Sequence, residues 1–325
     1  MCREFARTMP VNRRWVWWAC IAIAGWLVTP AFAQSPAETA VAEAPAKTGR
    51  RPFCWKIEHN GSAASYLLGS LHVAKPELYP LPDALECAFT KAEVLVVEAD
   101  PATAEDPAFL VQILQRVLDT ADRPLAEGLS EEAVKKLAAV LKTLKLKREI
   151  VERFEPWYVA QMISVLEMSR LGVDLTSGVD LHFINQARDK VPIIELEGAA
   201  NQLDFFDKFT DEEQSLLLEY TLIDLERIGS MMDDMTRAWQ TGDAGQMEEL
   251  LFGYLEESAG LEKAFDRIFG ERNRAMATRI RELLAGGKSC FIIVGAGHLV
   301  GEDGLLELLD DEETVLTQLP VSDEE

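Results

Sequence analysis

Two predicted strands near opposite ends of the chain end in the same short motif. The apolar run SYLLGSLH carries Gly69 and His72, and the run FIIVGAGH repeats the pattern with Gly295 and His298. Continuous apolar runs of this kind are typical of strands buried on both faces of a sheet. Glycine before the histidine permits a tight turn or a close approach of another backbone. Because ligands of open α/β sheets bind at the carboxyl ends of strands, the two motifs predict one site shared by both histidines.

Two further predicted strands end in carboxylates. The run VLVV is followed by Glu98 and Asp100. The run PIIELE contains Glu195 and Glu197, which strand alternation places on one face. An ionised carboxylate beside a buried strand is costly unless a cation or hydrogen-bond donors meet it, so Glu98 is the strongest candidate for a functional site. We expect Asp100 to cap the next helix.

His72, His298 and Glu98 together form a candidate metal site. Imidazole nitrogens and carboxylate oxygens are ligands of Mn, Co, Zn and Fe, so these side chains predict a divalent metal ion as cofactor. Glu98 is expected to act either as a third ligand or as the general base. The alternative is that both histidines are structural residues, hydrogen-bonded at the strand ends.

A predicted helix over residues 263–283 carries a cation on its apolar face. Arg272 lies on the apolar stripe, and Asn273 lies beside it. Such a cation predicts a partner carboxylate or a bound anion, and the alternative is an arginine that snorkels from the edge of the helix. The stripe consists of Phe265, Phe269, Met276, Ile280 and Leu283.

The stretch TSGVDLHF predicts the start of another helix. Ser177 and Asp180 match the S-x-x-D pattern of a capping box, which assigns Asp180 a structural role. We expect His182, on the same helix, to lie at the surface or in the core and not to be a ligand.

Strand patterns at both ends of the chain bracket two long helical stretches. CWKIEH and SYLLGSLH flank Asn60-Gly61, which is a strong hairpin signal. The chain closes with the strand pattern TVLTQL. Helical patterns cover residues 83–91, 101–172, 199–284 and 305–309. This arrangement predicts the α/β class, with a mixed sheet and large helical insertions, in a single domain over residues 51–325.

Residues 1–33 have the pattern of a secretory signal peptide. Arg13 and Arg14 precede a short apolar run, and Ala31-Phe32-Ala33 offers a cleavage site after Ala33. The run is short for a membrane span. We therefore expect cleavage, no membrane span afterwards, and a periplasmic or secreted protein. The alternatives are an uncleaved anchor and export by the twin-arginine route. Residues 34–50, rich in Ala and Pro, predict a disordered linker.

Charge and cysteine content narrow the partners. The chain has 32 Lys and Arg against 55 Asp and Glu, a net charge of −23. Such a surface repels phosphate backbones and anionic lipid, so we expect no nucleic-acid partner. Beyond the predicted signal peptide the chain keeps Cys54, Cys87 and Cys290, an odd number for an oxidising compartment. One disulfide and one free thiol fit this count. Cys54 and Cys290 each begin a predicted strand and are candidates for neighbours, with the pairing left open.

At these motifs the chain resembles the TraB/GumN family, the group that also includes the TIKI metalloproteases. The resemblance covers about residues 52–320 and rests on GSLH, VVEAD, GVD, LEG, ERN and GAGH in this order. It implies an α/β fold related to the erythromycin esterase and ChaN-like group, and a metal-dependent peptidase mechanism for the TIKI branch. On this chain it implies a metal centre of His72, His298 and Glu98, with Arg272 and Asn273 nearby. Gly297 departs from the family, in which a larger residue is common there.

Two functions from different classes follow from these patterns. The first is a secreted or periplasmic metal-dependent hydrolase, a peptidase that cleaves a peptide or protein substrate with a metal-activated water. Arg272 or Asn273 would stabilise the developing oxyanion or position the substrate. The second is a non-catalytic protein of the cell envelope that binds a peptide, a metal or haem. The GumN name adds an accessory role in surface-polysaccharide production, for which no carbohydrate-binding pattern speaks. The sequence does not predict an oligomeric state.

Overall fold

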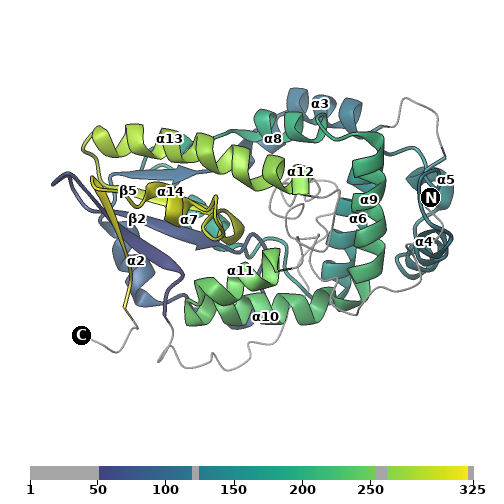
Figure 1. The fold of residues 1–325 in the computed structure, drawn as a ribbon, viewed down its shortest axis with the longest axis horizontal. Coiled ribbons are helices and arrows are strands. Elements are labelled where there is room, and N and C mark those ends of the chain that lie inside the picture. Colours follow the sequence, from purple (N-terminus) through teal and green to yellow (C-terminus); the bar gives the residue numbers. More distant parts are fainter. Residues whose placement is uncertain (1–50, 119–123, 254–261, 321–325) are drawn as a thin grey trace.

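The computed structural model describes residues 51–118, 124–253 and 262–320 and is built around one mixed sheet (Figure 1). The predicted signal peptide and linker lie outside the described residues. The six strands lie in the order β4-β3-β5-β2-β1-β6. They are β1 (Cys54–His59), β2 (Ser65–Ser70), β3 (Val94–Val97), β4 (Ile193–Glu195), β5 (Cys290–Gly295) and β6 (Thr314–Gln318). The predicted α/β class and mixed sheet are therefore confirmed.

The strands that carry the candidate site residues run parallel to one another. β5 lies between β2 and β3 and is parallel to both, and β4 extends the sheet parallel to β3. β2, β3 and β5 are buried at every position, which explains their continuous apolar runs in the sequence, whereas β4 is only partly buried. Parallel pairing places the carboxyl ends of all these strands at the same edge of the sheet.

The other edge of the sheet is antiparallel. β1 and β2 form the predicted hairpin, with Asn60 and Gly61 in the left-handed region at its turn. β6 pairs with β1, so the last strand of the chain joins the first. This pairing brings the two ends of the described chain into one sheet.

Helices cover both faces of the sheet and extend away from it. On one face, Phe89 and Phe183 pack against Phe291 of β5 with ring centroids 5.6 and 4.9 Å apart. Figure 1 shows α13 along one side of the sheet, α10 and α11 below the middle of the molecule, and the packed pair α6 and α9 beyond them, with α4 and α5 farthest from the sheet. The helices are α2 (Asp83–Thr90), α3 (Pro107–Val117), α4 (Glu131–Thr143), α5 (Arg148–Val151), α6 (Pro156–Arg170), α7 (Val179–Ala187), α8 (Ala199–Phe206), α9 (Asp211–Asp224), α10 (Ile228–Thr241), α11 (Ala244–Phe252), α12 (Glu262–Phe265), α13 (Glu271–Ala285) and α14 (Leu305–Leu309). In the described part of the chain, no helix combines the length and apolar character needed to cross a membrane.

The predicted helix over residues 263–283 contains a break in its periodicity. A π-helical turn, η6 (Asp266–Gly270), separates α12 from α13. Phe265, Phe269, Met276 and Ile280 of the predicted stripe are buried. The buried side of α13 ends at Leu284 instead of the predicted Leu283, which is only partly buried. Arg272 and Asn273, directly after the π turn, are both buried.

The cysteines do not pair. Cys54, Cys87 and Cys290 are free thiols. The expectation that Cys54 and Cys290 are neighbours is wrong, because β2 lies between β1 and β5 in the sheet. Cys87 lies exposed on α2.

Candidate functional site

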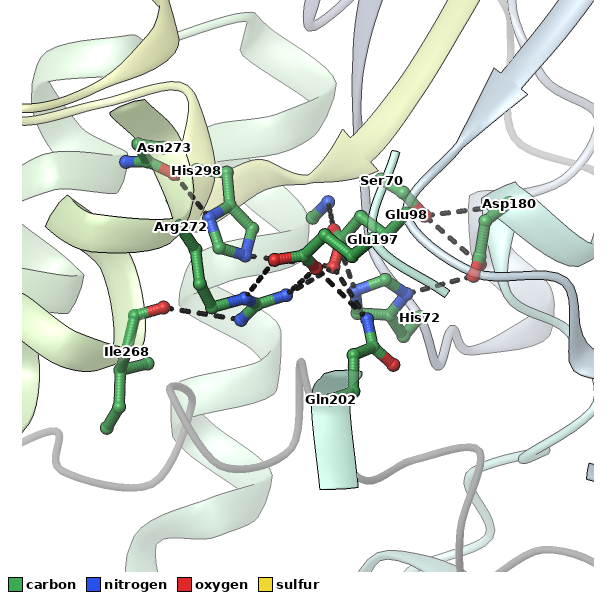
Figure 2. Close-up of polar contacts among 11 residues, drawn as sticks. Ser70, His72, Glu98, Asp180, Glu197, Gln202, Ile268, Arg272, Asn273 and His298 are labelled. Carbon is green, nitrogen blue, oxygen red and sulfur yellow. Dashed lines mark hydrogen bonds and ion pairs between the residues drawn. The ribbon is translucent and has the colours of Figure 1, made fainter. Parts of the chain in front are cut away.

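The candidate site lies where the parallel strands end. His72 follows β2, Glu98 follows β3, Glu197 follows β4, and His298 ends the short 3-10 turn η7 (Ala296–His298) after β5. Figure 2 shows the two imidazoles on either side of Glu98. The sheet thus brings together the three residues that the sequence predicts as a metal site.

The glycines of the two motifs act through close packing. Gly69 lies inside β2 and not at a turn, and a Cβ there would lie 2.6 Å from the Phe53 ring and 3.1 Å from the Ala296 Cα. At Gly295, whose φ is −54°, a Cβ would lie 2.8 Å from Nε2 of His72. Neither glycine has a positive φ, so the close approach expected from the sequence is the role that holds, and the tight turn at Gly69 is not formed.

Glu98 is the buried centre of the site, with 5% of its surface exposed. Its Oε1 accepts a hydrogen bond from the Gly295 backbone N–H at 2.5 Å. Its Oε2 accepts from Nη2 of Arg272 at 2.9 Å and from Nε2 of Gln202 at 3.4 Å. Burial raises the pKa of Glu98 above its usual value, although Arg272 and His72 oppose this. The cost of a buried carboxylate is thus met by donors and a cation, as its place in the sequence indicates.

His72 is oriented by a carboxylate. Its Nδ1 lies 2.9 Å from Oδ2 of Asp180, and the Ser70 hydroxyl lies 3.1 Å from the other oxygen, Oδ1. Burial lowers the pKa of His72, but Asp180 and then Glu98 raise it by more, so the pKa lies above its ordinary value.

Asp180 does not have the predicted capping role. The N-cap of α7 is Gly178, which makes no side-chain cap, and Asp180 is buried between Ser70 and His72. The S-x-x-D pattern was misleading because Ser177 turns away and donates its hydroxyl to backbone carbonyls, including that of Ala74. Asp180 is therefore part of the site.

His298 is oriented by a neutral amide. Its Nδ1 lies 2.5 Å from Oδ1 of Asn273, whose Nδ2 donates to the Asp303 backbone oxygen at 2.8 Å. Because the amide oxygen accepts, the proton is assigned to Nδ1 of His298, which leaves a lone pair on Nε2. Burial, followed by the charges of Arg272 and His72, holds the pKa of His298 well below its ordinary value.

The two Nε2 atoms point at the same carboxylate. Nε2 of His72 lies 3.9 Å from Oε1 of Glu98, and Nε2 of His298 lies 3.8 Å from Oε2. Both nitrogens are buried and have no hydrogen-bond partner among the described residues. Imidazole ligands of metals are held in this way, with Nδ1 fixed by an oxygen and Nε2 free.

The donor chemistry therefore fits a divalent ion, with a limit set by the geometry. Among the described residues, no group of three or more His, Cys, Asp or Glu side chains is already arranged to hold a metal. Both oxygens of Glu98 already accept hydrogen bonds, from Gly295 and Arg272. The two imidazoles are thus the stronger ligands, and Glu98 would need a small shift to become the third.

Arg272 links two carboxylates, the buried Glu98 and the partly buried Glu197. Its Nε and Nη2 donate to the two oxygens of Glu197 at 2.7 and 2.6 Å, and Nη2 also donates to Glu98. Burial lowers the pKa of Arg272, but Glu197 and Glu98 raise it by more. The predicted partner carboxylate is confirmed, and the alternative of a snorkelling side chain is wrong because only 9% of Arg272 is exposed.

The remaining polar residues near these strands lie outside the site. Glu195 does not share the surroundings of Glu197, because its Oε1 accepts from the Asp100 backbone N–H. Asp100 caps the 3-10 turn η3 (Pro101–Glu105), as predicted, and also pairs with Arg188. His182, expected not to be a ligand, contacts Glu86 at 2.7 Å.

Sequence reasoning missed Gln202. Its Nε2 donates to both Glu98 and Glu197 at 3.4 Å. It lies within α8 among residues with no motif of their own, so no pattern marked it. Asp180, in contrast, lies in the GVD motif at the predicted start of the helix, so the sequence did mark this residue, although not its contact with His72.

The fold and the site define an α/β protein with two imidazoles and a buried carboxylate at the carboxyl ends of parallel strands. The chain belongs to the TraB/PrgY/gumN family, whose model matches residues 53–318. It is 26% identical over 250 residues to the uncharacterized protein YbaP of Shigella flexneri, across 77% of this chain and 89% of that protein. The same figures hold for YbaP of Escherichia coli strain K12. No solved structure matches the chain significantly.

Proposed function

We propose that the protein is a metal-dependent hydrolase of the cell envelope, and more specifically a peptidase. The observation that carries the proposal is the pair of buried Nε2 atoms of His72 and His298, which have no hydrogen-bond partner among the described residues and face the carboxylate of Glu98. A buried nitrogen without a hydrogen-bond partner destabilises the folded protein. One ion bound by both nitrogens would remove this destabilisation at each of them. The resemblance to the TIKI metalloproteases supports a peptide or protein as the substrate, and the secretory pattern of residues 1–33 supports a periplasmic or secreted location.

His72 and His298 would hold the ion, which is Mn, Co, Zn or Fe by the chemistry of these ligands. When bound, such an ion supplies a Lewis acid that lowers the pKa of water and polarises a carbonyl. Glu98 would either complete the ligand set or accept the proton of the attacking water. Asp180 and Asn273 would keep each Nδ1 protonated and so direct each Nε2 lone pair toward the ion.

Arg272 and Asn273 would act as positioning residues. Asn273 uses its amide oxygen on His298 and one of its two amide N–H groups on the Asp303 backbone oxygen, so these contacts hold His298 in place. Arg272 holds Glu98 and Glu197 in place and also donates to the Ile268 carbonyl. The wider kinship with the erythromycin esterase and ChaN-like folds belongs to this proposal as well, supported by the site at the strand ends.

The experiment is a metal analysis followed by a cleavage screen. The protein is purified without chelators or a histidine tag, and its metals are quantified by mass spectrometry. We expect about one equivalent of a transition metal in the wild type and in His182→Ala, and little in His72→Ala or His298→Ala. The metal-loaded protein is then incubated with a peptide library.

Each outcome has a defined meaning. Cleavage that both site variants lose supports the peptidase. A metal or peptide that is bound and released unchanged would replace this function with the non-catalytic binding protein. No metal, even after each ion is added back, would make the two histidines structural.

A further inference from the structure

An apolar hollow opens beside the two imidazoles. It is small: the centre of a water-sized sphere can move through about 30 Å³ of it. Its walls come from residues after β2 and β5, from α10, α11 and the π turn before α13. The residues that line it include Leu71, His72, Met235, Leu251, Phe269 and Gly297.

Gly297 lets two walls of this hollow pack closely. A Cβ at Gly297 would lie 2.9 Å from Cε1 of Phe269 and 3.4 Å from Cδ1 of Leu251. Any larger side chain there would therefore have to displace the Phe269 ring and would change the shape of the hollow. The Phe269 ring also contacts His298, with ring centroids 5.2 Å apart. The hollow and the imidazoles are thus parts of one continuous surface.

The chemistry of the walls selects the occupant. Apart from His72, none of the described residues that line the hollow has a side chain that can carry a charge. A charged group entering it would lose its hydration without gaining a partner. An apolar side chain would instead gain about 25 cal/mol for each Å² removed from water. The close spacing of Phe269 and Leu251 across Gly297 favours a short side chain.

We propose that this hollow is the subsite for a short apolar side chain of the substrate, of the size of alanine, valine or leucine, next to the bond that is attacked. This proposal rests on the proposed function, because only an enzyme has a substrate. The binding preference itself does not depend on turnover, so it can be tested separately.

The first test measures binding without catalysis. The full protein is labelled with ¹³C at its methionine methyls, and Met235 is assigned from the Met235→Leu variant. The probes are the N-acetyl amides of leucine, glycine and lysine. We expect the leucine probe to shift the Met235 signal with an affinity about tenfold above that of the lysine probe. Met168, on α6 and not part of the hollow, serves as the internal control. No shift of Met235 with the leucine probe, or an equal affinity for the lysine probe, would overturn the proposal.

Two variants that narrow the hollow sharpen this test. Gly297→Val places a side chain between Phe269 and Leu251, and Leu251→Phe enlarges a wall away from the imidazoles. Both should weaken the leucine probe about tenfold or more. The wild-type probe series decides the proposal even if one variant fails to fold.

The second test uses the peptide library on the metal-loaded protein. A subsite predicts enrichment of alanine, valine or leucine at one position beside the cleaved bond, and Gly297→Val should move the preference toward glycine. Cleavage without such a preference would refute the subsite and leave the proposed function intact. Probe binding at Met235 without cleavage of any peptide would refute the proposed function and leave the hollow as an apolar binding site.

Discussion

His72 and His298 follow the same Gly-x-x-His motif, yet their surroundings are electrostatically opposite. Asp180, a carboxylate on α7, holds Nδ1 of His72, whereas Asn273, a neutral amide on α13, holds Nδ1 of His298. Burial lowers the pKa of both imidazoles, but Asp180 raises that of His72 above its ordinary value, whereas the charges of Arg272 and His72 lower that of His298 further, to well below its ordinary value. The motif fixes the position of each imidazole, and the presence or absence of a carboxylate at its Nδ1 distinguishes the two pKa values.

This difference gives the two histidines separate duties at one site. His298 stays neutral and fully buried, with its Nε2 lone pair permanently available. His72 lines the apolar hollow, and its raised pKa lets it hold a proton to a higher pH than His298 does. Both feel the charge of Arg272, which lowers the pKa of each.

Removal of Arg272 is the largest perturbation of this comparison. Arg272→Met would leave the buried Glu98 and the partly buried Glu197 without their cation, and we expect a loss of about 3–5 kcal/mol in the free energy of unfolding. Urea denaturation measures this loss. Arg274→Met is the matched control, because Arg274 is half exposed and pairs only at the surface, so little change is expected. A similar small change for both variants would show that the buried ion pairs contribute nothing.

The two motif glycines should differ when each is replaced by alanine. Gly69→Ala forces a Cβ against the Phe53 ring, and we expect a loss of about 1–3 kcal/mol in unfolding free energy with metal binding retained. Gly295→Ala instead directs its Cβ at Nε2 of His72 and should abolish metal binding. Urea denaturation and calorimetric metal titration separate the two effects. Metal binding by Gly295→Ala at wild-type affinity would contradict the placement of the site.

Asp180→Asn should make the surroundings of His72 resemble those of His298. We expect metal affinity to fall by about 10–100-fold, as is typical when the group that orients a metal-binding histidine is changed. Titration calorimetry measures the affinity. Asn273→Asp is the reciprocal variant, and it should raise the pKa of His298 in an NMR titration of the metal-free protein. An unchanged pKa there would contradict the electrostatic origin of the difference.

Asp180→Asn also tests a predicted pH dependence of the free energy of unfolding in the metal-free protein. The folded pKa of His72 is raised, so its protonation favours the folded state as pH falls from that pKa toward about 6.5. This contribution is complete below about 6.5 and is lost as pH rises through the folded pKa. The folded pKa of His298 is lowered, so the unfolded chain gains protons first and stability falls as pH drops below about 6.5. Asp180→Asn should remove the first effect and keep the second, which urea denaturation at a series of pH values would reveal.

Ser70→Ala is the smallest expected perturbation. The variant removes two hydrogen bonds with Asp180, one to its carboxylate and one from its backbone N–H, and leaves the carboxylate with His72, so we expect a loss of about 1–2 kcal/mol in unfolding free energy. A loss as large as that of Arg272→Met would show that Ser70 has a further role.

Much of the site was predictable because the sequence pattern shows where the buried strands end. Buried parallel strands have continuous apolar runs, and Glu98 and the two histidines follow them directly. Asn60-Gly61 similarly marked the hairpin, since both positions need a left-handed backbone. Arg272 was recognisable because a cation on an apolar stripe requires a partner.

The parts that were not predictable depend on long-range geometry. Asp180 matched a local capping pattern, but its partners are Ser70 and His72, more than 100 residues earlier in the chain. The π turn over residues 266–270 has no pattern in the sequence that would predict it. Cys54 and Cys290 were wrongly expected to be neighbours because strand order is not encoded in the strands themselves.

The most direct test of the shared site is a cobalt titration of four chelator-treated proteins, followed by calorimetry: the wild type, His72→Ala, His298→Ala and the double variant. A single site formed by both imidazoles predicts about one equivalent in the wild type and a loss in each single variant as complete as in the double variant. Retention of cobalt by either single variant at wild-type affinity, or independent losses that add in the double variant, would contradict a site in which His72 and His298 bind the same ion.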